Sequence, residues 1–207
     1  MPDKYGVRQD GYCYPGSDVL INLLGITDGK LLDEAEVSFT TFRLGQYDYP
    51  SFSDFSLDTL KNIHFYLFQD VYVWAGELRT VDISKGNTRF ANCARIEPEA
   101  KKLFRQLAQE RCLQGLSRAG FIARLVHYFS ELNVIHPFRE GNGRAQRLLF
   151  ESIAVNAGYV LRWRSVDPTL WVPANIAAYH GSLAQLNALF DTALATIVPR
   201  KDPKKSE

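Results

Sequence analysis

One stretch of this sequence constrains the fold more than any other, because a strongly apolar helix must end abruptly inside it. From Phe121 to Ile135 apolar residues recur every three or four positions, which is the period of a helix with a buried face. Pro137 disfavours helical backbone in the residue before it, so we expect this helix to end at His136. Gly141 follows, and helical apolar spacing resumes over about 143–157. The sequence therefore predicts two core helices joined by a tight loop.

The remaining segments predict further helices and one pair of strands. Apolar periodicity and capping residues favour helices over residues 17–24, 31–44, 57–68, 99–110, 168–179 and 182–197. Residues 78–84 instead alternate apolar and polar side chains, Lys85-Gly86-Asn87 suits a turn, and residues 88–91 can return antiparallel. An isolated two-stranded hairpin is only marginally stable, so it should lie as a flap against the helices. The predicted fold class is all-α with a single β-hairpin flap.

The chain should form one domain. Its 207 residues suit a single hydrophobic core, and we assign residues 1–198 to it. Residues 1–16 are rich in Tyr, Gly and Pro and should form an extended N-terminal arm on the surface. Residues 199–207 carry charge and proline and should form a flexible tail.

Charge and hydropathy disfavour two classes of partner. The formal net charge is +1, so the chain lacks the excess of positive charge that a general binder of nucleic acid or anionic membranes uses. It has no run of about 18 apolar residues, and its N-terminus lacks the basic and then apolar pattern of a secretory signal. We therefore expect a cytoplasmic protein with no direct nucleic-acid partner and no membrane partner.

The loop between the two core helices carries residues that suit phosphate binding. Gly141 and Gly143 allow the backbone to approach a ligand closely. Amide N–H groups at the start of a helix attract anions, and the helix dipole adds to this attraction. Arg144 and Arg147 are three residues apart on the second helix, so both can point their guanidinium groups at phosphate oxygens.

Two more side chains in this loop suggest what happens to the bound phosphates. Glu140 offers an oxygen ligand for Mg²⁺, which commonly binds through one or two carboxylates plus substrate phosphates. His136 stands where the first helix breaks, and an ordinary imidazole can accept a proton near neutral pH. One loop thus supplies a base, a metal ligand, an anion site and two cations.

The same loop resembles the signature of the Fic family. Residues 136–147 match it position for position: His, any residue, Phe, any residue, Asp or Glu, Gly-Asn-Gly-Arg, two residues of any type, and Arg. The eight defining positions are filled by His136, Phe138, Glu140, Gly141, Asn142, Gly143, Arg144 and Arg147. Residues 70–79 and 14–26 are also similar to the family, so the resemblance covers about residues 12–197.

The resemblance implies a protein adenylyltransferase, which moves AMP from ATP-Mg²⁺ to a hydroxyl side chain of a target protein and releases diphosphate. His136 would deprotonate the target hydroxyl, Glu140 would hold Mg²⁺, and Phe138 would anchor the loop in the core. The nucleotide phosphates would be bound by Gly141, Asn142 through its amide, Gly143, Arg144 and Arg147.

The hairpin also has a role in this family, where it lies next to the active site and aligns a target segment by backbone pairing. By resemblance, the docking flap consists of Ser84, Lys85, Gly86, Asn87, Thr88, Arg89 and Phe90. Backbone pairing tolerates many sequences, so the flap does not identify the target.

Regulation is implied by a motif that this sequence lacks. Many Fic proteins are silenced by a helix with Ser or Thr, three residues of any type, and Glu followed by Gly or Asn. Here Glu140 is the only Glu followed by Gly or Asn, and His136 stands four residues before it. The chain thus resembles the short bacterial FicT toxins, whose inhibitor is a separate small antitoxin. The implied antitoxin contacts Arg147, and the implied targets are the ATPase subunits of DNA gyrase and topoisomerase IV.

Three other classes of function compete with AMP transfer: a different transfer reaction, nucleotide binding without turnover, and nucleic-acid binding. Relatives that transfer phosphate depart from Gly-Asn-Gly-Arg, which is intact here, whereas relatives that transfer phosphocholine are not separated by the sequence. A nucleotide-binding module without turnover would not need His136. A helical nucleic-acid-binding protein would be expected to carry more positive charge than +1. Among the other histidines, His64 and His127 lie in apolar helical patterns and should be packing residues, and His180 should be a surface residue.

Overall fold

The computed structural model describes Tyr5, residues 10–49 and residues 55–197. The predicted tail at 199–207 and residues 1–4 and 6–9 of the predicted arm at 1–16 lie outside the described residues. Most described residues are helical, in the order α1 (Gly29–Gly45), α2 (Leu57–Phe68), α3 (Cys93–Gln109), α4 (Arg118–Ile135), α5 (Asn142–Asn156), α6 (Pro168–Tyr179) and α7 (Ala184–Ala193). Two short 3₁₀ turns lie at Arg111–Leu113 and Trp163–Ser165. The all-α prediction is confirmed.

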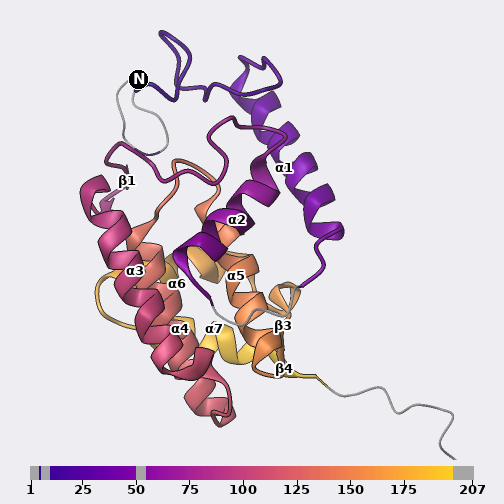
Figure 1. Ribbon diagram of the computed structural model, residues 1–207, viewed down its shortest axis with the longest axis vertical. Helices are drawn as coiled ribbons and strands as arrows, with labels where there is room; N and C mark the ends of the chain where they lie inside the picture. Colours follow the sequence, from indigo (N-terminus) through magenta and orange to yellow (C-terminus); the bar gives the residue numbers. More distant parts are fainter. Residues whose placement is uncertain (1–4, 6–9, 50–54, 198–207) are drawn as a thin grey trace, which may run out of the picture.

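The two helices on either side of the loop form the centre of the molecule. Helix α4 packs against α3, α5, α6 and α7, and α5 also packs against α2. Figure 1 shows α1 and α3 at opposite edges, with α2, α4 and α5 between them. Among the described residues, no helix is long and apolar enough to cross a membrane.

Side-chain caps explain where several helices begin. The Asp28 carboxylate accepts a hydrogen bond from the Leu31 amide at 2.8 Å at the start of α1. At the start of α2, Ser56 and Thr59 form a reciprocal capping box. At the start of α4, the side chain of Ser117 accepts a hydrogen bond from the Gly120 amide. Helix α3 begins at Cys93, six residues before the predicted start at 99, because the side chain of Asn92 caps it there.

The hairpin is confirmed but is shorter than predicted. Strand β1 (Ser84–Lys85) pairs antiparallel with β2 (Thr88–Arg89), with Ser84 opposite Arg89 and Lys85 opposite Thr88. A second small sheet, which the sequence analysis did not predict, joins β3 (Tyr159–Leu161) to β4 (Leu194–Thr196). The helix predicted over 182–197 therefore ends at Ala193, where the chain becomes extended.

The helix predicted over 17–24 is wrong. The structure has a loop there, held by the side chain of Asn22, which is 8% exposed. Its amide group donates to the carbonyls of Leu20 and Ile26, and its carbonyl oxygen accepts from the amides of Leu24 and Ile26. A buried Asn that bonds its own backbone on both sides stabilises a loop in place of a helix.

Candidate active site

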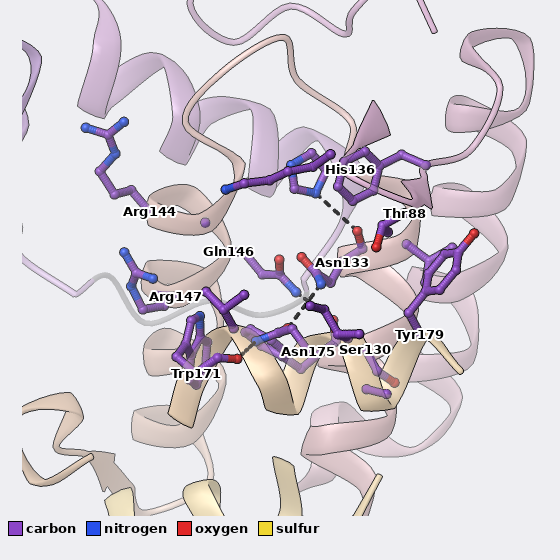
Figure 2. Close-up of a pocket in the computed structure, with 18 of the residues that line it drawn as sticks. Thr88, Ser130, Asn133, His136, Arg144, Gln146, Arg147, Trp171, Asn175 and Tyr179 are labelled. Carbon is purple, nitrogen blue, oxygen red and sulfur yellow. Dashed lines mark hydrogen bonds between the residues drawn. The ribbon is translucent and has the colours of Figure 1, made fainter. Parts of the chain in front are cut away.

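The loop between α4 and α5, residues 136–142, is called the catalytic loop below. A cavity of about 380 Å³ brings together this loop, the flap and helix α6. Its lining includes nine of the predicted site residues: His136, Glu140, Gly141, Gly143, Arg144 and Arg147 of the loop and α5, and Lys85, Thr88 and Phe90 of the flap. In Figure 2, Arg144 and Arg147 extend from α5 on one side, while His136, Thr88 and Tyr179 lie on the other. Helix α4 adds further lining residues, among them Ser130 and Asn133, and α6 adds others, among them Trp171, Asn175 and Tyr179.

His136 ends helix α4 in a left-handed conformation, with φ of 48°. Its backbone N–H still donates to the carbonyl of Leu132 at 3.0 Å, so the residue closes the last turn as the chain leaves the helix. This conformation is uncommon for a residue with a Cβ atom, and it persists only where the surroundings hold it. It places the imidazole in the cavity.

The imidazole of His136 is fixed on two sides. Its Nδ1 lies 3.1 Å from the carbonyl oxygen of Asn133 (Figure 2). Because a carbonyl only accepts, Nδ1 carries the proton, and Nε2 keeps a lone pair. The ring stacks on Phe90 of the flap, with centroids 3.8 Å apart and planes 14° apart. Burial lowers the pKa of His136 to about 4, so the ring is neutral near pH 7 and can accept a proton.

Glu140 is buried and is held through its backbone as well as its side chain. Its carboxylate accepts a hydrogen bond from the Gly141 amide at 2.9 Å. Its carbonyl oxygen lies 3.0 Å from Nε2 of His64, a fully buried residue of α2. The other ring nitrogen of His64 accepts the Gly76 N–H at 2.8 Å, which fixes the tautomer with the proton on Nε2.

Gly141 occupies a position that no other residue could fill without distortion. Its φ is +77°, and a Cβ atom there would lie 2.2 Å from the ring of Phe68. At Gly143 a Cβ atom would make only an ordinary contact, 3.7 Å from Arg147. The first glycine is therefore required by packing, and the second leaves room beside the start of α5.

The side chain of Asn142 closes the loop from behind. Its oxygen accepts the Phe138 N–H at 2.8 Å, and its nitrogen donates to the Phe138 carbonyl at 2.7 Å. The side-chain amide is thus occupied within the loop, and the backbone N–H of Asn142 is the group left for a phosphate. Phe138 is fully buried and stacks on His64 with centroids 3.8 Å apart, as an anchor should.

The two arginines differ in their surroundings. Arg144 forms an ion pair with Glu36 of α1, a buried carboxylate that also accepts from the hydroxyl of Tyr72. Arg144 also lies 3.7 Å from Glu140. Arg147 makes no hydrogen bond or ion pair with any of the described residues, and burial followed by the charge of Arg144 lowers its pKa. The structure thus leaves Arg147 as the more available cation.

The flap residues divide between two cavities. Lys85, Thr88 and Phe90 line the main cavity, whereas Ser84, Gly86, Asn87 and Arg89 line a shallower one of about 310 Å³. The hydroxyl of Tyr179 on α6 donates to the carbonyl of Arg89 at 3.1 Å, which ties the flap to α6.

The cavity offers a metal ion a single carboxylate. Among the described residues, no three His, Cys, Asp or Glu side chains form a metal cluster, and Glu140 is the only acidic residue that lines the main cavity. This donor set does not suit a resident metal. It does fit Mg²⁺ that arrives with a nucleotide and takes most of its ligands from phosphates and water.

Several residues that build the site were not predicted from the sequence. Arg139 is 1% exposed and pairs with Asp10 of the arm at 2.9 Å. Tyr5 is 6% exposed, lines the cavity and lies edge-on to the His136 ring at 6.0 Å, so the arm is not simply laid on the surface. Arg79 and His64 hold the loop by hydrogen bonds to the backbone carbonyls of His136 and Glu140. No local pattern marks these residues, because their partners are distant in the sequence.

Comparison with known proteins agrees with this geometry. The Fic/DOC family matches residues 54–154. The chain is 40% identical over 195 residues to a probable protein adenylyltransferase Fic of Escherichia coli, covering 94% of this chain and 97% of that protein. It is 42% identical to the protein adenylyltransferase VbhT of Bartonella schoenbuchensis, over 90% of this chain and 39% of VbhT.

Solved structures show the same fold. The BepC protein of Bartonella tribocorum, determined with bound AMPPNP, superposes with a TM-score of 0.83 at 27% identity, covering 90% of this chain and 97% of that one. A Fic domain from Bartonella quintana with bound ADP superposes with a TM-score of 0.82 at 29% identity, covering 89% and 94%. On the sequence match over almost its whole length, together with the loop described above, this chain belongs to the Fic/DOC family.

Proposed function

We propose that this protein transfers AMP from ATP-Mg²⁺ to a hydroxyl side chain of a target protein. One observation carries the proposal. A single cavity contains a histidine with an unprotonated Nε2, a glycine-bearing helix start and two arginines. Of the two sequence relatives described above, one is named a probable protein adenylyltransferase and the other a protein adenylyltransferase. The two related structures contain adenine nucleotides.

The residues have distinct tasks in this reaction. Nε2 of His136 takes the proton of the target hydroxyl, whose oxygen then attacks the α-phosphorus of ATP. The bond from that phosphorus to the bridging oxygen breaks, and diphosphate leaves. The amides at the start of α5, with Arg144 and Arg147, bind the phosphates and stabilise the charge that moves onto the leaving diphosphate.

Glu140 would hold Mg²⁺ together with the phosphates. When bound, Mg²⁺ neutralises phosphate charge at the scissile bond. His64 holds the backbone carbonyl of Glu140, and the Gly141 amide donates to its carboxylate, so these two bonds keep the carboxylate in the cavity before nucleotide arrives.

The flap is proposed to dock the target. Its hairpin connects directly to Phe90, which stacks on His136, so a segment paired along residues 84–90 would pass close to the base. Docking by backbone hydrogen bonds would leave target choice to a wider surface.

We further propose that the protein acts as a toxin in the bacterial cytoplasm, with the ATPase subunits of DNA gyrase and topoisomerase IV as targets. A separate small antitoxin would silence it through Arg147. The availability of Arg147 to an outside carboxylate supports this idea. Expression of this chain in bacteria, alone and together with a candidate antitoxin, tests the toxin role. A chain that is harmless when expressed alone, while fully active on protein targets, would refute that role.

A labelling experiment tests AMP transfer. Purified protein is incubated in bacterial lysate with Mg²⁺ and ATP labelled at the α- or the γ-phosphate. We expect protein label from the α position only, and a loss of about 100-fold or more in His136→Ala, because a general base contributes about 10²–10⁴ in rate. His180→Ala, at an exposed position outside the cavity, is the matched control.

The other outcomes separate the competing functions. Label from the γ position would mean phosphate transfer. Label from neither position, with ATP still bound, would favour a nucleotide-binding module.

A further inference from the structure

Arg79 lies between the flap and the turn at residues 135–137, which carries His136. The residue is buried, with an exposed fraction of 2%. It belongs to no helix or strand and follows the turn at Gly76. The sequence pattern placed Arg79 on a strand with alternating polar positions, yet the guanidinium points inward. A buried guanidinium requires hydrogen-bond acceptors for its N–H groups, and here the acceptors are backbone carbonyls.

Three hydrogen bonds from Arg79, two from the guanidinium and one from the backbone, end on the turn that carries His136. Nε of Arg79 donates to the His136 carbonyl at 2.8 Å, and Nη2 donates to the Ile135 carbonyl at 3.3 Å. The backbone N–H of Arg79 donates to the Pro137 carbonyl at 2.9 Å. The last carbonyls of a helix lack partners within the helix and carry the negative end of its dipole. Arg79 therefore supplies hydrogen-bond donors to the carbonyls at the end of α4, including that of His136, the residue with the left-handed backbone.

The other bonds end on the two roots of the flap. Nη1 donates to the Val81 carbonyl at 2.6 Å, just before β1, and Nη2 donates to the Ala91 carbonyl, just after β2. Asp82 lies 3.9 Å from Nη1. One planar guanidinium thus spans both ends of the hairpin and the helix end.

We propose that Arg79 is a positioning residue that fixes the His136 imidazole relative to the docking flap. Arg79 does not itself line the cavity, and it acts through the backbone of residues 135–137 and through the flap roots. The His136 ring is stacked on Phe90, which adjoins Ala91, so both the backbone and the ring of His136 depend on this group. A lysine has the same charge but lacks the planar fork that reaches carbonyls on both sides.

The test compares Arg79→Lys and Arg79→Gln with a matched control, Arg43→Lys. Arg43 also makes two side-chain bonds, to Asp70 at 2.6 and 2.7 Å, but lies outside the cavity. The proposal rests on the proposed AMP transfer, so one readout is kcat for that reaction. We expect kcat to fall about 10- to 100-fold in both Arg79 variants, because small misplacements of a reacting group cost this much. We expect the affinity for ATP to change by less than about threefold, and Arg43→Lys to keep its kcat.

A second readout requires neither nucleotide nor target. The chain has four histidines, so the Hε1 resonance of His136 can be assigned by comparison with His136→Ala. The stacked Phe90 ring shifts that resonance, and we expect the shift to shrink in both Arg79 variants and to remain in Arg43→Lys.

The two readouts separate the two proposals. A wild-type protein with no α-label would refute AMP transfer while leaving the NMR comparison intact. An unmoved His136 resonance, or a kcat within twofold of wild type, would overturn the role of Arg79. Failure of both Arg79 variants to fold would also overturn it, because Arg79 would then be a residue of the fold alone.

Discussion

The catalytic loop and the flap line the same cavity but are built in contrasting ways. In the loop, His136, Phe138, Arg139, Glu140 and Asn142 are all at most 9% exposed. Each is held by a named partner elsewhere in the chain or in the loop itself. The flap has two residues in each strand, and Lys85, Gly86, Asn87 and Arg89 are exposed.

The difference separates chemistry from recognition. Phosphoryl chemistry requires a base, amides and cations at fixed positions before the reaction, so a rigid loop is useful. A docking edge that uses backbone groups gains from exposure and tolerates changes in its side chains. Substitutions in the loop should therefore have large effects, and substitutions at the tip of the flap should have small ones.

The largest effect should come from Gly141, the first glycine of the loop, and the second glycine, Gly143, is its control. Gly141→Ala places a methyl group 2.2 Å from the Phe68 ring at a φ of +77°. Overpacking and backbone strain together should lower the free energy of unfolding by about 3 kcal/mol. Gly143→Ala meets only an ordinary contact within α5, so it should change stability by less than about 1 kcal/mol and can even stabilise the helix. Urea unfolding measures both, and equal losses would contradict the packing argument.

A medium effect, counted for each residue, should appear as pH dependence of stability. Burial lowers the pKa of both His64 and His136 to about 4, against an ordinary value of 6.5. Between these values the unfolded chain binds protons that the folded chain does not, so the free energy of unfolding falls as pH falls below 6.5. From pH 7 to pH 5 each histidine should remove about 2 kcal/mol.

His64→Phe tests this dependence, because phenylalanine keeps the stacking on Phe138 and removes the titrating ring. The variant should be less stable at pH 7, since the Gly76 N–H and the Glu140 carbonyl lose their partner. Its stability should fall about half as steeply between pH 7 and pH 5. A slope equal to that of wild type would show that His64 accepts its proton without difficulty when folded.

The fold was predictable where the signal was local. Helix α2 was predicted with its observed bounds from its apolar periodicity, and the structure shows a capping box of Ser56 and Thr59 at its start. The prediction of a helix over 17–24 failed because the Asn22 side chain takes the backbone hydrogen bonds that a helix would use. Apolar spacing alone does not reveal that competition. Strands β3 and β4 pair across more than thirty residues, so no local pattern joins them.

The candidate site divides in the same way. The residues of the motif are contiguous in the sequence, and the cavity contains six of its members as predicted. The residues that hold the motif come from other segments, such as Asp10 for Arg139, Glu36 for Arg144 and His64 for Glu140. His64 was expected to be a packing residue, and it is buried as expected. Its two hydrogen bonds become visible only when α2 meets the loop.

The smallest effect should come from the tip of the flap. Asn87 is exposed and makes no side-chain hydrogen bond with any of the described residues. Asn87→Ala should change the free energy of unfolding by less than about 0.5 kcal/mol, as is usual for exposed positions. If the target docks by backbone pairing, α-label on the target band should also stay within about twofold of wild type. A loss of more than tenfold in a stably folded variant would mean that the flap recognises its target through side chains. The contrast between a fixed loop and a tolerant flap would then fail at the point where it is easiest to measure.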